Sequence, residues 1–195
     1  QSEKPDDPWY KKKKWDQWML KIAEAEKDTK QIRQYARKLF LERDHNFEFY
    51  KTLKATYSAE EWETELRKII RKLRGPGDRF YSPSRTLAEI YRIEGQWDSL
   101  LNLLRENADL HMLEKYGKHL QEQYPVEILE IYRDLLRDFA RQTGRSRYQE
   151  IVRILNDIQQ IEGGTIFAGE MVEEFRRKYK NRPAMREELN RVNVR

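Results

Sequence analysis

Apolar residues recur along almost the whole chain at steps of three and four, the spacing of one face of an α-helix. The clearest stripe is formed by Ile128, Ile131, Tyr132, Leu135, Leu136 and Phe139. Strict apolar–polar alternation over the length of a strand is hard to find, and valine is scarce. Only 8 Gly and 6 Pro interrupt the 195 residues, so long uninterrupted elements are expected. The sequence therefore predicts an all-α fold.

Start and stop signals divide this pattern into separate helices. Ser58, followed three residues later by Glu61, forms a capping box that opens a helix. Gly95 stands just past a helical segment, where a left-handed residue ends the helix, and Pro125 and Pro183 each suit a first turn. These signals predict about eleven helices joined mostly by short turns. Their predicted ranges are Trp9–Glu26, Lys30–Arg43, Phe47–Thr56, Ala59–Leu73, Arg85–Glu94, Trp97–Glu106, Leu110–Gln123, Val126–Gln142, Arg147–Ile161, Ile166–Lys180 and Ala184–Arg191.

One pair of helices has the residue pattern of a tetratricopeptide-like hairpin. In such a hairpin, Ala88 has the place of the small residue, Tyr91 that of the aromatic residue and Gly95 that of the turn. Leu100 and Leu104 have the places of packing residues. A small residue lets two helices approach closely, and the glycine turns the chain back. Tetratricopeptide repeats usually have Ala where this chain has Leu100, so the copy is divergent. Stacked hairpins bury a continuous core, which predicts an α–α superhelix, a solenoid of divergent tetratricopeptide-like hairpins.

The longest break in the helical pattern is Arg74–Ser84, which is rich in glycine and proline. It could divide two subdomains, but Phe80 and Tyr81 inside it favour burial. We therefore expect an ordered loop within a single domain of residues 1–195, with a subdivision at residues 74–84 as the alternative. Because the chain begins with Gln rather than Met, we expect it to be the C-terminal part of a larger protein.

Metal-ligating residues are few. The chain has no Cys, which excludes a disulfide scaffold, a thiol nucleophile and every cysteine-ligated metal site. His111 and His119 stand eight residues apart, more than two helical turns, so they cannot hold one ion as a pair one turn apart would. His45 is the remaining one of the chain's 3 histidines. The sequence predicts no metal site and no cofactor.

Catalytic motifs are equally scarce. Asp134 and Asp138 share a helix face, but the arginines at 133, 137 and 141 flank them and predict surface ion pairs. The glycines at 75 and 77 lack the Gly-Lys-Ser/Thr ending of a phosphate-binding loop, and Gly163–Gly164 follows a helix rather than a strand. We therefore expect the protein not to be an enzyme.

Positive charge gathers toward the C-terminal end. The chain has 39 Lys and Arg against 34 Asp and Glu, a formal net charge of only +5. Two cationic stretches are nevertheless candidates for a surface that binds an anionic partner. Its candidate residues are Arg141, Arg145, Arg147, Arg176, Arg177, Lys178, Lys180 and Arg182. The small net charge favours solvated helix faces as the interpretation of both stretches, and binding of an anionic partner is the alternative.

Aromatic residues crowd the first predicted helix. Trp9, Tyr10, Trp15 and Trp18 are more than one stripe requires. We expect core packing for most of them, since their spacing largely fits one buried face. Trp9 and Tyr10 are candidate contacts for a partner.

Two segments near the C-terminus resemble a known family. Arg145–Glu150 at the start of one helix, and the basic helix end and closing helix of Phe175–Leu189, are similar to the C-terminal helical region of bacterial SWIM zinc-finger proteins. The hairpins between Leu39 and Phe139 resemble the region that precedes it. The resemblance implies a helical-repeat scaffold beside a zinc finger. The Cys/His ligands of that finger are absent from this chain, so no metal-binding role is assigned to any residue here.

These observations favour a non-catalytic helical-repeat module that binds a protein or peptide. An accessory nucleic-acid-binding surface, working with an upstream zinc finger, is the alternative. No run approaches the roughly 18 apolar residues of a membrane span, and no signal-peptide pattern opens the chain. We therefore expect a cytoplasmic protein with no membrane partner.

Overall fold

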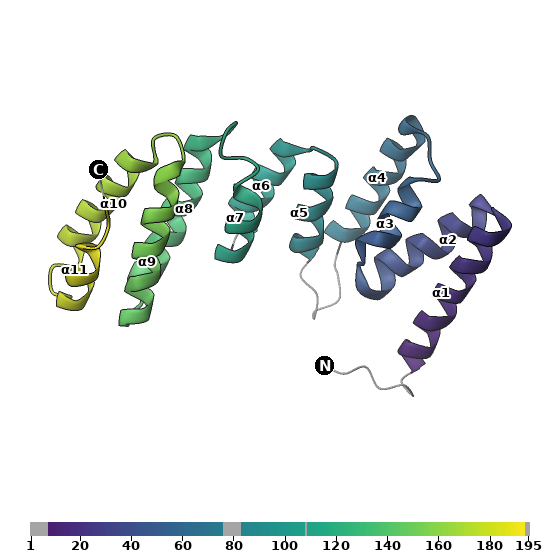
Figure 1. Cartoon of the computed structure of the whole chain (residues 1–195), viewed down its shortest axis with the longest axis horizontal. Coiled ribbons are helices and arrows are strands. Elements are labelled where there is room, and N and C mark those ends of the chain that lie inside the picture. The colour runs from purple at the N-terminus through teal and green to yellow at the C-terminus, as the bar shows by residue number, and fades with distance from the viewer. Residues whose placement is uncertain (1–7, 76–82, 108, 194–195) are drawn as a thin grey trace. The chain divides into compact units, whose positions relative to one another are not determined.

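The computed structural model describes residues 8–75, 83–107 and 109–193 (Figure 1). Within these ranges the chain is helical, with no strand, as the periodicity predicts. The eleven helices are α1 (Pro8–Glu26), α2 (Thr29–Leu39), α3 (Phe47–Lys54), α4 (Ala59–Arg74), α5 (Pro83–Ile93), α6 (Trp97–Asn107), α7 (Leu110–Gly117), α8 (Pro125–Arg141), α9 (Arg145–Asp157), α10 (Gly164–Lys178) and α11 (Pro183–Leu189). A π-helical turn, η1 (Phe40–Asp44), extends α2, and a 3₁₀ turn, η2 (Ile158–Gln160), extends α9. The predictions of an all-α fold and of eleven helices are confirmed.

Several helix ends have the capping residues that the sequence predicts. The hydroxyl of Ser58 accepts from the backbone N–H of Glu61 (3.3 Å), and the Glu61 carboxylate accepts from the backbone N–H of Ser58 (3.2 Å). Gly95 ends α5 with a φ of 65°, a left-handed conformation that costs glycine little. Pro125 and Pro183 each occupy the first turn of a helix, where a missing N–H is harmless.

The end of α7 differs from the prediction. The helix ends at Gly117 rather than at Gln123, and turns connect it to α8. Glycine is a poor helix former, and Pro125 disfavours the helical conformation at the residue before it. Leu120 is nevertheless fully buried, and this burial produces the helical apolar spacing of the connecting segment. The periodicity therefore predicts the burial of Leu120 correctly, but it is wrong in extending the helix to Gln123.

The chain divides into two compact units, Gln1–Thr86 and Leu87–Arg195. The described part of the segment at 74–84 ends at residue 75 and resumes at residue 83, so Phe80 and Tyr81 lie outside the described residues.

In the first unit α1 packs against α2, and α2 against α3. Tyr50 of α3 is fully buried and meets Phe40 of η1 (ring centroids 5.1 Å apart) and Trp62 of α4 (5.3 Å). These aromatic contacts form the core of the unit.

Helix α1 buries a different face from the one expected. Trp15 and Trp18 are 64% and 65% exposed, so the expectation of core packing is wrong for both. The buried face consists of Leu20, Ala23 and Asp16, whose carboxylate accepts from Lys38 of α2 (2.7 Å). A fully buried alanine allows α2 to approach α1 closely, whereas tryptophan at this contact would hold the helices apart.

In the second unit, helices close in sequence lie against one another. α6 contacts α7, both contact α8, α8 contacts α9 and α10, and α9 contacts α11. One glycine permits a close approach: a Cβ on Gly164 would lie 1.9 Å from the carbonyl oxygen of Ile158, whereas one on Gly117 would lie 3.8 Å from Ile128, an ordinary contact. Among the described residues, no helix combines the length and the apolar character required to cross a membrane.

Candidate functional site

Arg182, a candidate for an anionic partner, instead caps the end of α8. Its guanidinium donates to the carbonyl oxygens of Ala140 (2.6 Å), Gln142 (3.3 Å) and Arg141 (3.4 Å). It also lies 4.4 Å from the ring centroid of Tyr179. The last carbonyls of a helix lack partners within it and carry partial negative charge, so a cation stabilises them.

Arg145 joins the start of α9 to α11. Its Nε donates to the buried carboxylate of Glu188 (2.7 Å), and its Nη2 donates to Glu187 (2.7 Å). Arg191 forms a second ion pair with Glu188 (3.0 Å). The hydrogen bond from Arg145 holds the pKa of Glu188 below its ordinary value, because it stabilises the ionised carboxylate. Arg145 is thus already engaged in an internal ion pair.

Two further candidate cations also have internal contacts. Arg141 pairs with Asp138 (2.8 Å) on the exposed side of α8. The guanidinium of Arg147 lies 4.8 Å from the ring centroid of Phe139. A partner that bound these cations would have to compete with those contacts.

Of the remaining candidates, Arg176 and Lys180 meet at one hollow between α10 and α11, which Arg186 also lines. Arg176 is engaged there by Asn190 (2.9 Å) and by Glu173 (3.2 Å). The other two, Arg177 and Lys178, are exposed near the end of α10, where the Nζ of Lys178 lies 5.7 Å from the ring centroid of Tyr179.

The two candidate aromatic contacts are described unequally. Tyr10 is half-buried, and the Nζ of Lys14 lies 5.2 Å from its ring centroid. The side chain of Trp9 lies outside the described residues.

Histidines do not gather at a shared site. His119 stacks on Trp97 with ring centroids 6.4 Å apart, and His45 meets Phe40 edge-on at 6.0 Å. Burial, together with the positive charges of nearby lysine and arginine, lowers the pKa of His119. Over the described ranges, no three His, Asp or Glu side chains are placed to hold a metal ion.

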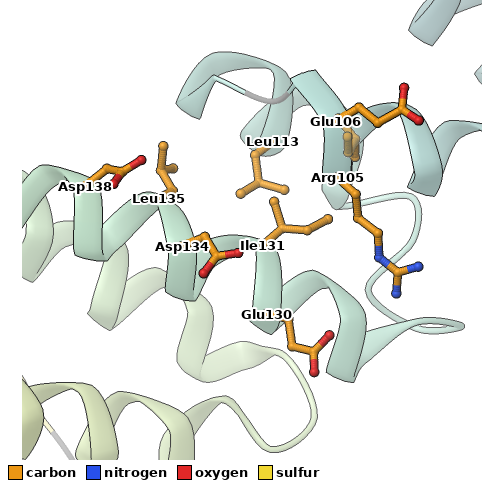
Figure 2. A pocket seen from close by; sticks show the side chains of 9 residues that line it. Arg105, Glu106, Leu113, Glu130, Ile131, Asp134, Leu135 and Asp138 are labelled. Carbon is orange, nitrogen blue, oxygen red and sulfur yellow. The ribbon is translucent and has the colours of Figure 1, made fainter.

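A groove of about 470 Å³ lies between α6, α7 and α8, and we call it the α8 groove (Figure 2). Its lining residues are Leu104, Arg105, Glu106, Leu113, Glu130, Ile131, Asp134, Leu135 and Asp138. Figure 2 shows Ile131 of α8 and Leu113 of α7 pointing toward each other across its floor. Leu113 is fully buried, whereas Ile131 and Leu135 are half-buried and present apolar surface to the groove.

Carboxylates form the rim of the α8 groove along one helix. Glu130, Asp134 and Asp138 are exposed and follow one another at four-residue steps (Figure 2). Four residues advance about 6 Å along a helix, so the rim carries a negative charge once per turn. Within the described chain, the carboxylates of Glu130 and Asp134 form no hydrogen bond or ion pair, whereas that of Asp138 pairs with Arg141.

Ion pairs to α10 explain why Asp134 forms no ion pair with its arginine neighbours on α8. Arg133 pairs with Glu170 (3.5 Å), and Arg137 pairs with Glu174 through two hydrogen bonds (2.9 and 3.0 Å). These contacts direct both arginines toward α10. The expected ion pairs along α8 itself therefore form only at Asp138, and the groove keeps a negative rim.

A second hollow continues from Glu130 toward the start of α10; we call it the Ile166 hollow. It is lined by Val126, Leu129, Glu130, Arg133, Glu162, Gly163, Ile166, Phe167 and Glu170. Val126 is 64% and Ile166 72% exposed, so apolar surface faces solvent here. Because Glu130 lines both sites, an extended ligand could contact the two together.

The spacing of apolar and acidic residues along α8 predicts part of the α8 groove. Ile131 and Leu135 read as core positions, and Asp134 and Asp138 read as a shared acidic face. The sequence did not indicate which carboxylates pair with Arg133 and Arg137, because these are glutamates of α10 more than thirty residues away.

Comparison of the chain with models of protein families, with curated proteins and with solved structures finds no match.

Proposed function

We propose that the protein is a non-catalytic interaction module that binds a basic, amphipathic segment of a partner protein in the α8 groove. The supporting observation is the arrangement of that groove, in which an apolar floor at Ile131 and Leu135 lies below a rim of carboxylates. Clefts that combine apolar surface with a few placed polar groups are typical ligand sites.

The spacing of the rim favours a helical partner. Carboxylates at four-residue steps match lysines or arginines at the same steps on a second helix, whose apolar stripe would cover Ile131 and Leu135. A helix that places its apolar face in a groove between helices is a recurrent mode of peptide recognition.

The two parts of the groove would contribute differently to binding. Exposed ion pairs each stabilise by only about 0–1 kcal/mol, so the rim would mainly set specificity and the association rate. Apolar burial contributes about 25 cal/mol per Å² removed from water, and it would supply most of the affinity. We therefore expect moderate affinity that falls as salt screens the rim.

For the architecture, we propose that the hairpins belong to a divergent tetratricopeptide-like solenoid. The support within the second unit is that neighbouring helices pack side by side, with small residues such as Ala88 and Gly117 fully or largely buried. Such repeats present grooves as a consequence of stacking. The resemblance to the helical region of SWIM zinc-finger proteins supports a scaffolding role of the same kind.

The test uses a labelled amphipathic peptide of about 16 residues, built only from Leu and Lys, in a fluorescence anisotropy titration of the full chain. The E130K/D134K variant should bind it at least about tenfold more weakly, because like charges then face each other. The control variant E63K/E122K changes the formal charge by the same amount at exposed positions outside the groove. It should bind as the parent chain does.

Two results would contradict this proposal. One is equal loss of binding in both variants, which would show that only net charge matters. The other is equal binding of a peptide in which Glu replaces every Lys.

We propose nucleic-acid binding as the second candidate, supported by the hollow at Arg176, Lys180 and Arg186. Phosphate contacts make affinity depend steeply on salt. K180E/R186E should therefore weaken binding of single-stranded RNA or duplex DNA and flatten the salt dependence. Unchanged binding by this variant would show that the hollow is not a nucleic-acid site.

A further inference from the structure

Helix α1 presents an apolar face that the described part of its own unit leaves exposed. Trp15, Trp18 and Ile22 are 64%, 65% and 43% exposed, and their spacing of three and four places them in one stripe. Leu20 and Ala23, on the opposite side of the helix, make the contact with α2. The helix thus has two apolar faces, of which its own fold uses one. Contiguous exposed apolar side chains are typical of interaction sites.

Lysines border this stripe. Lys14 and Lys21 are both exposed and stand seven residues apart, so they lie one above the other along one side of it. The distance between them along the helix axis is about 10 Å. The exposed face of α1 is therefore a basic, amphipathic helix surface, the ligand chemistry proposed above for the α8 groove.

We infer that α1 of one copy of this chain docks in the α8 groove of a second copy. This inference rests on the proposed function, since it names an occupant for the same groove. The carboxylates from Glu130 to Asp138 span about 12 Å along α8, close to the spacing of the two lysines. The indole rings of Trp15 and Trp18 would cover the apolar floor at Ile131 and Leu135, and the lysines would face the acidic rim.

An anionic membrane fits α1 less well than the groove does. Glu24 and Glu26 are exposed at the end of the helix, and anionic lipid would repel both. The carboxylates of the groove extend only from Glu130 to Asp138, so they can face Lys14 and Lys21 without facing the glutamates of α1.

The two surfaces of this contact are different, so the interface is heterologous. Each copy offers one α1 face and one groove, and further copies can add until a ring closes or a chain extends. One helix face buries less than the roughly 800 Å² per partner of a standard interface, so the association should be weak and dependent on concentration.

Sedimentation velocity of the full chain tests the inference at concentrations from about 10 µM to about 1 mM. The parent chain should form dimers and larger species at the high end, and these should dissociate when salt is added. The variant K14E/K21E, which changes only α1, and the variant E130K/D134K, which changes only the groove, should each remain monomeric. Circular dichroism checks that both variants stay helical.

Mixing the two variants gives the decisive result. The intact α1 of E130K/D134K can bind the intact groove of K14E/K21E, and the glutamates at positions 14 and 21 of the one variant match the lysines at positions 130 and 134 of the other. The mixture should therefore form the dimers and larger species that neither variant forms alone.

A parent chain that stays monomeric throughout, or a mixture that stays monomeric, would overturn the inference. Binding of a monomeric parent chain to phosphatidylserine vesicles through Trp15 and Trp18 would also overturn it, in favour of a lipid contact. If the Leu–Lys peptide still binds in either case, the groove remains a peptide site and only its occupant is wrong.

Discussion

Substitution of Gly164 by alanine probes the closest approach in the second unit. The added Cβ would lie 1.9 Å from the carbonyl oxygen of Ile158 and 2.9 Å from its carbon, whereas ordinary contact begins at 3.4 Å. Both atoms belong to the backbone, so η2 or the start of α10 would have to move by about 1.5 Å. Overpacking of this kind costs about 1–3 kcal/mol, which corresponds to a fall in Tm of about 2–12 °C for a chain of this length.

Thermal unfolding followed by circular dichroism measures this effect. Gly95→Ala is the control, because no atom lies within 4 Å of its Cβ and only the left-handed φ of 65° opposes alanine. That conformation costs about 1–2 kcal/mol, so the control shows the size of a fall in Tm that arises from backbone strain alone. Alanine is a better helix former than glycine by about 1 kcal/mol. A Tm for Gly164→Ala equal to or above that of the parent chain would therefore show that the close approach does not exist.

Three further changes test other parts of the structure. Arg182→Ala removes the donor for three carbonyls at the end of α8, including that of the buried Ala140, and should lower stability to urea by about 1–3 kcal/mol. The pKa of Glu188 is lowered in the folded chain, so its contribution to stability is present above the unfolded pKa and is lost as the pH falls through the folded pKa. Urea midpoints measured below the ordinary value of 4.5 should thus fall less steeply with decreasing pH in Glu188→Gln than in the parent chain. Trp18→Ser should change the unfolding free energy by less than about 0.5 kcal/mol because the side chain is exposed, whereas Tyr50→Ala should cost about 3–5 kcal/mol. The reverse order in that pair would mean that the buried face of α1 is misassigned.

Backbone features could be predicted where a local interaction decides them. The capping box at Ser58 and Glu61, the left-handed Gly95 and the proline at the start of α8 each depend on residues within one turn. The end of α7 could not be read in this way, because Leu120 keeps the apolar spacing while the chain around it turns.

Side-chain environments that depend on distant elements were harder to predict. Trp15 and Trp18 have the spacing of a core stripe, but the buried face of α1 is decided by how closely α2 approaches Ala23. Several expected surface cations have internal partners: Arg182 caps α8, and Arg145 pairs with Glu188 of α11. No local pattern contains these pairings, since each joins residues about forty positions apart.

The most direct test of the α8 groove is methyl NMR of the full chain with labelled Ile, Leu and Val during titration with the Leu–Lys peptide. If the peptide binds in the groove, the largest shift changes fall on Ile131, Leu135 and Leu113, and E130K/D134K greatly reduces them at the same peptide concentration. Shift changes confined to methyl groups outside the groove, or the same changes in E130K/D134K, would contradict it.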